Sequence, residues 1–300
     1  MLKDTFRNTG IFGKLLQLFF TSLFLGIIGM GIVKIAYGGA EDINSLKAGQ
    51  FILSAFVILM PPVILGYLWY DKPAEAYSLN VNPPVKIILL TVLLVIVISP
   101  FINLLSYINE QIVLPDFMKI IELKFVEMEE AAAELTNKML NTNSLGGLMG
   151  NLFLMAAFPA FCEEIYFRGA LLNIFSDQKN KNTAIWVVAI IFSLIHFQMY
   201  GFIPRMILGA LLGYLLVWSG NLWVPVIAHF TNNALAVLIS YSGKSDPNIQ
   251  NIEDIGKAGT YWMGMISAVI SGYILWKIYK TCKKNSAEIQ KNNTTMKATN

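Results

Sequence analysis

Long apolar segments dominate this sequence and restrict what the chain can fold into. Eight segments are long enough, or nearly so, to be membrane spans, at about residues 11–37, 51–70, 86–108, 147–176, 184–198, 202–219, 222–241 and 260–280. A helix of roughly 20 apolar residues crosses the hydrocarbon core of a bilayer. Hydrophobic residues make up 55% of the chain and charged residues 14%, which excludes a disordered chain and argues strongly against a soluble enzyme. We therefore predict an all-α fold, a polytopic transmembrane bundle of about eight helices.

The distribution of charge predicts how this bundle lies in a membrane. Lys and Arg concentrate at the N-terminus, in the 71–86 and 177–183 loops and in the C-terminal tail, and are fewer in the alternate loops. Both termini of this multi-pass protein are therefore expected to be cytoplasmic, in the plasma membrane if the source is bacterial. The 22 Lys plus Arg against 19 Asp plus Glu, without a basic stripe outside the tail, predict no nucleic-acid binding. The lipid bilayer is the expected partner, and two cysteines are too few for a disulfide framework or a cysteine zinc site.

Spans and charges together divide the chain into four regions. Residues 1–145 hold three spans and an acidic segment, 109–145, within which 118–140 is expected to be an amphipathic surface helix. Residues 146–241 form a core of closely joined spans, in which Pro159 is expected to bend the first helix. Residues 242–284 hold the last span, and 285–300 are expected to be a disordered basic tail.

Ionisable side chains inside the core spans are the strongest indication of a functional site. They are few, and the two histidines among them are the only ones in the chain: Glu163, Glu164, Arg168, His196, Arg205 and His229. An ionisable group at membrane depth is costly, so each one is a candidate functional residue. Hydrogen bonding between helices is the structural alternative for either histidine alone, and a structural ion pair is the alternative for the acidic residues.

The segment FCEEIYFRG separates two adjacent carboxylates by their helical positions. Glu164 and Arg168 are four residues apart and are expected to pair on one side of the helix, as a structural ion pair. Glu163 points about 100° away and has no local countercharge. A carboxylate in such an apolar setting is suited to act as a general base.

Two further segments add polar groups at helical spacing. In FSLIHF, Phe192 lies one turn before His196, so its ring is expected to cover and orient the imidazole. In AHFTNNA, His229 and Asn233 are four residues apart and project from one face, where they could donate hydrogen bonds to a developing oxyanion. Asn232 is expected to point elsewhere, as an amide that packs between helices.

These groups favour hydrolysis of a peptide bond. Glu163 would take a proton from water, His196 would position that water or hold a metal, and His229 with Asn233 would bind the oxyanion. Glu163, His196 and His229 also form a set that catalytic zinc sites use, so one divalent metal ion, zinc, is an open alternative. The soluble zinc-protease helix with two histidines around a glutamate is absent.

The motifs EEIYFR, FSLIH and HFTNN resemble those of the CPBP family, the CAAX proteases and bacteriocin-processing enzymes also called the Abi family. That family's pattern is Glu-Glu, three residues, Arg; Phe, three residues, His; and His, three residues, Asn or Asp. All three are matched here without substitution, over about residues 150–241. The resemblance implies about eight transmembrane helices and makes 146–241 the catalytic core.

The resemblance also implies a role for each motif residue. Glu163 would be the catalytic base, Glu164 and Arg168 would shape the site, and His196, His229 and Asn233 would complete it. Family members are described as metalloproteases, with a metal-free glutamate mechanism as the alternative. The implied substrate is a peptide or lipidated peptide, of a prenyl-CAAX type or a bacteriocin or leader type.

The leading hypothesis is therefore an intramembrane endopeptidase with water activated by Glu163. The competing hypothesis is a non-catalytic membrane scaffold or bacteriocin self-immunity protein of the same fold. A proton-coupled transporter is weaker, because the hydropathy shows no repeated halves with interrupted helices. Cys162 is expected to be a small buried core residue, and Arg205 an interfacial side chain with a minor chance of contacting a substrate carboxylate.

Overall fold

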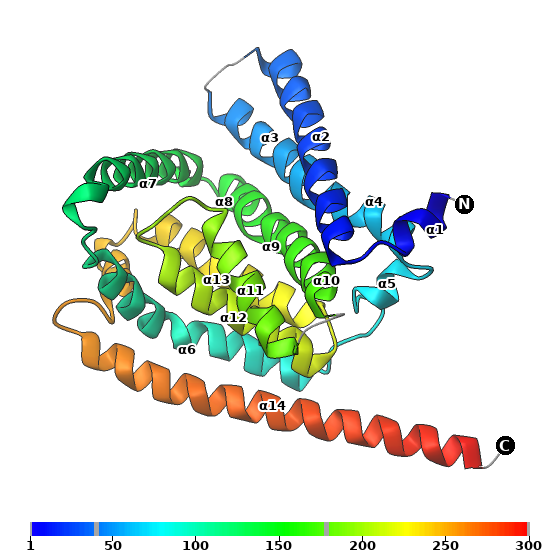
Figure 1. Ribbon diagram of the computed structural model, residues 1–300. Helices are drawn as coiled ribbons and strands as arrows, with labels where there is room; N and C mark the ends of the chain where they lie inside the picture. Colours follow the sequence, from blue (N-terminus) through cyan, green and yellow to red (C-terminus); the bar gives the residue numbers. More distant parts are fainter. Residues whose placement is uncertain (1, 39–41, 177–179, 299–300) are drawn as a thin grey trace.

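The computed structural model describes residues 2–38, 42–176 and 180–298, and over these residues it is helical, with no strand (Figure 1). This confirms the predicted all-α fold. The α-helices are α1 (Leu2–Arg7), α2 (Ile11–Tyr37), α3 (Ile43–Leu53), α4 (Met60–Trp69), α5 (Pro73–Ala76), α6 (Val85–Glu110), α7 (Lys119–Leu140), α8 (Leu145–Asn151), α9 (Phe158–Glu164), α10 (Leu172–Ser176), α11 (Lys181–Leu194), α12 (Phe202–Ser219), α13 (Trp223–Ser242) and α14 (Tyr261–Ala298). Short 3-10 helices cover Asp116–Met118 and Pro247–Asp254.

Two of the long helices contain π-helical turns. One runs from Ile43 to Trp69 with a π segment at Ser54–Leu59, and the other from Leu145 to Ser176 with π segments at Leu152–Ala157 and Ile165–Leu171. The first segment in each helix is followed closely by proline, Pro61 with Pro62 in one and Pro159 in the other, where a backbone donor is missing. The bend predicted at Pro159 is thus accommodated as a widened turn directly before the site.

Six helices among the described residues are long and apolar enough to cross a membrane: Ile11–Tyr37, Ile43–Trp69, Val85–Glu110, Leu145–Ser176, Phe202–Ser219 and Trp223–Ser242. These spans mark the chain as an integral membrane protein. Two of the eight expected spans are not among them. Residues 184–198 fall on α11, whose 14 residues extend only about 21 Å, short of the ~30 Å hydrocarbon core. Residues 260–280 form the first half of α14, where tyrosine, serine and glycine interrupt the apolar residues.

Helices α11 and α12 pack closely because glycines line their contact. A Cβ added at Gly213 would lie 2.9 Å from the Ile185 side chain, and one added at Gly209 would lie 3.3 Å from Ala189. Small residues let helix backbones approach in a membrane protein. This contact places the C-terminal end of α11 beside the first turns of α12. The resulting core of α9–α13 carries every residue that the sequence singled out as catalytic (Figure 1).

The acidic segment forms the surface helix expected from its sequence. Helix α7 spans Lys119–Leu140, and Met139 is its one fully buried side chain. It lies across the end of the bundle at which α8 begins (Figure 1). The C-terminal tail differs from the expectation, since α14 continues to Ala298 as a helix rather than ending near 284. Part of the basic 177–183 loop, residues 177–179, lies outside the described residues, and the cytoplasmic orientation of both termini stays a prediction.

Candidate active site

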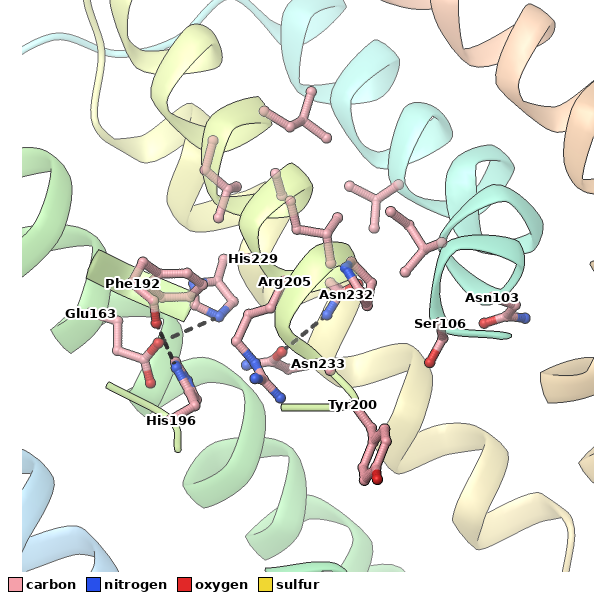
Figure 2. Close-up of a pocket in the computed structure, with 18 of the residues that line it drawn as sticks. Asn103, Ser106, Glu163, Phe192, His196, Tyr200, Arg205, His229, Asn232 and Asn233 are labelled. Atoms are coloured by element: carbon pink, nitrogen blue, oxygen red, sulfur yellow. Dashed lines mark hydrogen bonds and ion pairs between the residues drawn. The ribbon is translucent and has the colours of Figure 1, made fainter. Parts of the chain in front are cut away.

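A cavity of about 670 Å³ opens between α6, α7, α9, α12 and α13, and four of the six predicted catalytic residues line it. Those four are Glu163, His196, His229 and Asn233. Figure 2 shows their side chains converging from three separate segments of the chain. The other two, Glu164 and Arg168, are buried behind the cavity wall. The structure therefore brings the sequence motifs together in one place.

Glu163 and His229 face each other at the inner end of this cavity. Oε2 of Glu163 lies 3.8 Å from Nε2 of His229, and the Glu163 side chain keeps 23% of its surface exposed. Its carboxylate can therefore be reached by a water molecule or a substrate, unlike that of its neighbour Glu164. The 100° between successive helical residues accounts for this difference, as the sequence predicts.

Glu164 binds two partners in the protein interior. Its Oε1 accepts hydrogen bonds from Nη1 of Arg168 at 2.9 Å and from Nδ1 of His229 at 2.8 Å. The predicted Glu164–Arg168 ion pair is present, with side chains 0% and 1% exposed. The guanidinium of Arg168 also donates to the carbonyl oxygen of Gly209 at 2.9 Å and lies 4.7 Å from the ring centroid of Phe192. The ion pair thus connects α9, α11, α12 and α13.

The bond between Glu164 and His229 determines which imidazole nitrogen carries the proton and which one faces Glu163. A carboxylate can only accept, so Nδ1 of His229 carries the proton and Nε2 is directed toward Glu163. Sequence spacing could not show this bond, because the two residues are 65 positions apart. Glu164 is therefore both half of an ion pair and the group that orients His229.

His196 lies in the turn that follows α11, and its neighbours match the prediction. Its Nδ1 lies 2.7 Å from the carbonyl oxygen of Phe192, which can only accept, so Nδ1 is the donor. The Phe192 ring packs edge-on against the imidazole at a centroid distance of 5.0 Å. Nε2 of His196 is thereby left as an acceptor for a group in the cavity.

Asn233 projects from the same face of α13 as His229, as its spacing predicts (Figure 2). Asn232 also lines the cavity and donates to Oδ1 of Asn233 at 3.3 Å, so the expectation that it points elsewhere is wrong. Residues three and four positions after His229 flank it on either side of one helix face, so both amides reach the cavity. Because Oδ1 of Asn233 is the acceptor in this bond, the bond uses neither of the two amide protons of Asn233.

Comparisons with known proteins agree with this geometry. Residues 146–235 match the family model described as type II CAAX prenyl endopeptidase Rce1-like. This segment belongs to the CPBP family. An uncharacterised protein of Bacillus subtilis (strain 168), YpbD, is 31% identical over 103 residues, which are 30% of this chain and 50% of that protein. The chain thus matches about half the length of this curated relative, and no solved structure matches it significantly.

Arg205, which was expected to be an interfacial side chain, lines the candidate active site. It lies in the first turns of α12, and its side chain lines the same cavity as Glu163 and His229 (Figure 2). Nη2 donates to Oε1 of Gln198 at 2.6 Å. The sequence could not place Arg205 in the cavity, because that position depends on how α12 packs against α11 around Gly209.

Five polar residues of the cavity were not identified as site residues from the sequence, and they come from outside the histidine motifs. They are Asn103, Ser106 and Glu110 on α6, Glu129 on α7 and Tyr200 before α12. Asn103 had a usable signal, because an amide within an apolar span needs a partner just as an ionisable group does. Glu129 had none, since it is one of several glutamates on a surface helix.

The proposed zinc ligands do not form a metal site as they are placed here. Among the described residues, no group of three His, Cys, Asp or Glu side chains lies close enough together to hold a metal ion. Nδ1 of His229 donates to Glu164 and Nδ1 of His196 to a backbone carbonyl, so Nε2 would be the metal-binding atom of each histidine. We therefore derive no step through a metal, and metal dependence stays a prediction.

Proposed function

We propose that this chain is an intramembrane endopeptidase, CAAX prenyl protease-like, in which Glu163 activates a water molecule. One observation carries the proposal: the accessible carboxylate of Glu163 lies 3.8 Å from the imidazole of His229, which Glu164 holds in place. A general base with a neighbouring oriented imidazole is the arrangement that hydrolysis of an acyl bond needs. The match of residues 146–235 to CAAX prenyl endopeptidases supports the same reaction class.

The reaction begins with a water held between Glu163 and the scissile carbonyl. Glu163 takes a proton from this water while the oxygen forms a bond to the carbonyl carbon, which gives a tetrahedral oxyanion. Nε2 of His196 accepts a hydrogen bond from the second O–H of the water and so fixes the position of the water. The amide of Asn233 donates to the oxyanion, together with Nε2–H of His229 when that imidazole is protonated.

Collapse of this intermediate breaks the peptide bond. The carbon–nitrogen bond cleaves as the oxyanion re-forms a carbonyl, and the proton on Glu163 passes to the departing nitrogen. The products are a carboxylic acid and an amine, and Glu163 returns to its ionised form. Glu164 and Arg168 touch no reacting atom in this scheme, so they are positioning residues.

The apolar part of the cavity wall fits a hydrophobic or lipidated peptide. Val95 and Ile102 on α6 and Leu208, Leu211 and Leu212 on α12 form an apolar surface there. Substrate side chains or a covalently attached lipid gain free energy by leaving water for such a surface. The proposed substrate is therefore a membrane-associated peptide of the CAAX type or the leader type.

A comparison of peptide termini tests the proposal. Cells carrying wild type, Glu163→Gln or the matched surface variant Glu134→Gln at equal expression are analysed by mass spectrometry for protein termini. New termini should occur with wild type and Glu134→Gln and be absent with Glu163→Gln. Termini that are the same with Glu163→Gln as with wild type would refute the mechanism. They would favour the alternative, a non-catalytic scaffold or self-immunity protein.

A further inference from the structure

Arg205 is a cationic side chain in the catalytic cavity that the proposed mechanism does not use. It belongs to none of the three sequence motifs, and it lines the same cavity as Glu163 and His229. Figure 2 shows its guanidinium directed into the space beside Asn233 and His196. A positive charge placed there affects which substrate groups the cavity accepts.

The guanidinium is held in place but is only partly satisfied. Nη2 donates to Gln198 at 2.6 Å, while Nη1 is buried and has no hydrogen-bond partner among the described residues. Glu129 and Glu163 are near enough for their charges to act on Arg205, but neither carboxylate in this described part of the chain forms a salt bridge or hydrogen bond with it. A buried charged donor without a partner is costly, so its retention favours a ligand that supplies the acceptor.

Gly201 provides the space in which the guanidinium lies. A Cβ added at Gly201 would lie 2.8 Å from Nη2 of Arg205 and 3.3 Å from Nη1. The backbone of Gly201, at φ −100°, is one that alanine also adopts. The glycine is therefore needed for the position of Arg205 and not for the turn itself.

Acidic neighbours do not substitute for the missing acceptor. Glu129 on α7 lines the same cavity, but its carboxyl accepts from the backbone N–H of Tyr200, and burial raises its pKa above the usual range. This shift moves the carboxyl toward its neutral form, which reduces its repulsion of an anion. Glu110 also lines the cavity but is exposed, so water screens its charge.

We propose that Arg205 is a specificity-determining residue that binds the free C-terminal carboxylate of the substrate peptide. A guanidinium binds a carboxylate through two parallel hydrogen bonds, and Nη1 is available for one of them. Every peptide carries such a group at its end. Because Arg205 and Glu163 line one cavity of about 670 Å³, only a few residues fit between the bound terminus and the cleaved bond. The inference rests on the proposed function and narrows it to cleavage close to a C-terminus.

The test uses the full-length protein in detergent and one synthetic peptide pool in three forms. Each peptide carries S-farnesylcysteine at the fourth position from its C-terminus, followed by mixed residues. The first form ends in a free carboxylate and the second in a carboxamide. The third form also ends in a carboxamide, but its last residue is acidic. Retention on the protein and cleavage are measured separately by mass spectrometry. Retention tests the carboxylate site, and cleavage tests the proposed function.

Wild type should retain the free-acid pool about ten- to a hundredfold more strongly than the carboxamide pool. Arg205→Gln and Gly201→Ala should both reduce this ratio to about one, and Arg205→Lys should keep part of it because the charge remains. Gly201→Ala keeps the arginine and displaces it, so it separates position from charge. Monodisperse elution of each variant confirms folding.

Equal retention of acid and amide pools, no retention of either, or a preference that survives Arg205→Gln would overturn the inference. The inference would also be overturned if the carboxamide pool with an acidic last residue were retained as strongly as the free-acid pool. The bound carboxylate would then be that of a side chain. Arg205-dependent retention without any cleavage would keep the carboxylate site and refute the proposed function. Equal retention of the free-acid and carboxamide pools, with cleavage that Glu163→Gln abolishes, would refute the carboxylate site and keep the proposed function.

Discussion

The buried ion pair between Glu164 and Arg168 allows a quantitative test of how this site is held together. Arg168 makes two hydrogen bonds of 2.9 Å, to Glu164 and to the carbonyl of Gly209, and both ionised side chains are almost fully buried. Arg168→Met would leave the Glu164 carboxylate with His229 as its remaining partner. Removing one member of a buried pair typically costs about 3–5 kcal/mol.

The double variant separates the charge effect from the loss of packing. Glu164→Gln alone leaves a buried guanidinium without its counterion and should cost a similar amount. The variant with both Arg168→Met and Glu164→Gln buries no isolated charge. Its loss of stability should therefore fall below the sum of the single losses by about 2–3 kcal/mol, within the range found for residues in direct contact.

The measurement is the free energy of unfolding in mixed detergent micelles, followed by tryptophan fluorescence. An exposed pair at the same spacing, Glu134 and Lys138 on α7, provides a matched control, because its atoms are 2.7 Å apart while its side chains are 68% and 62% exposed. Lys138→Met should cost about 0.5 kcal/mol or less. Additive losses in the double variant, or a loss for Arg168→Met as small as that control, would refute the reasoning.

Three further predictions concern packing, pH and metal. Gly213→Ala should destabilise the protein by about 1–3 kcal/mol, since the new Cβ would lie 2.9 Å from Ile185; Gly150→Ala, with nothing within 4 Å, should be neutral or slightly stabilising in the same unfolding assay. Burial raises the pKa of Glu129 above 4.5, so the folded state binds this proton more tightly than the unfolded state, and stability is lost as the pH rises from the unfolded pKa through the folded one. Glu129→Gln should therefore gain unfolding free energy relative to wild type at neutral pH and not below 4.5; an equal difference at both pH values would contradict this. If the three candidate ligands hold zinc, purified protein should carry about one metal ion per chain and lose activity on chelation. The spacing of these residues favours the other outcome, in which activity persists after chelation. Elemental analysis paired with a cleavage assay distinguishes the two.

Helical spacing predicted the local part of the site. The Glu164–Arg168 pair and the edge-on packing of Phe192 against His196 both follow from residues spaced four apart. The accessible Glu163 follows from its angular offset from Glu164. Likewise, the hydropathy predicted an all-helical membrane protein, although six rather than eight helices meet the length and composition of a span.

Contacts between helices were beyond this reasoning. The bond from His229 to Glu164 depends on how α13 packs against α9, which no spacing within one helix reveals. Arg205 faces inward because glycines draw α12 onto α11, a packing effect that overrides the usual behaviour of arginine at a helix end. Glu129 reaches the cavity from a helix whose sequence is that of a solvated surface.

The two adjacent glutamates show how stability and chemistry are divided in this site. Glu164 bridges Arg168 and His229, so any change there alters both the packing of four helices and the orientation of the imidazole. Within the described residues the Glu163 side chain forms no hydrogen bond, and its contact with His229 is 3.8 Å long. Its neutral isostere therefore removes a proton acceptor while leaving the interior intact. Loss of activity with unchanged stability is therefore expected at Glu163 alone. Loss of both together is expected at Glu164 and Arg168, and this contrast distinguishes a catalytic group from its supports.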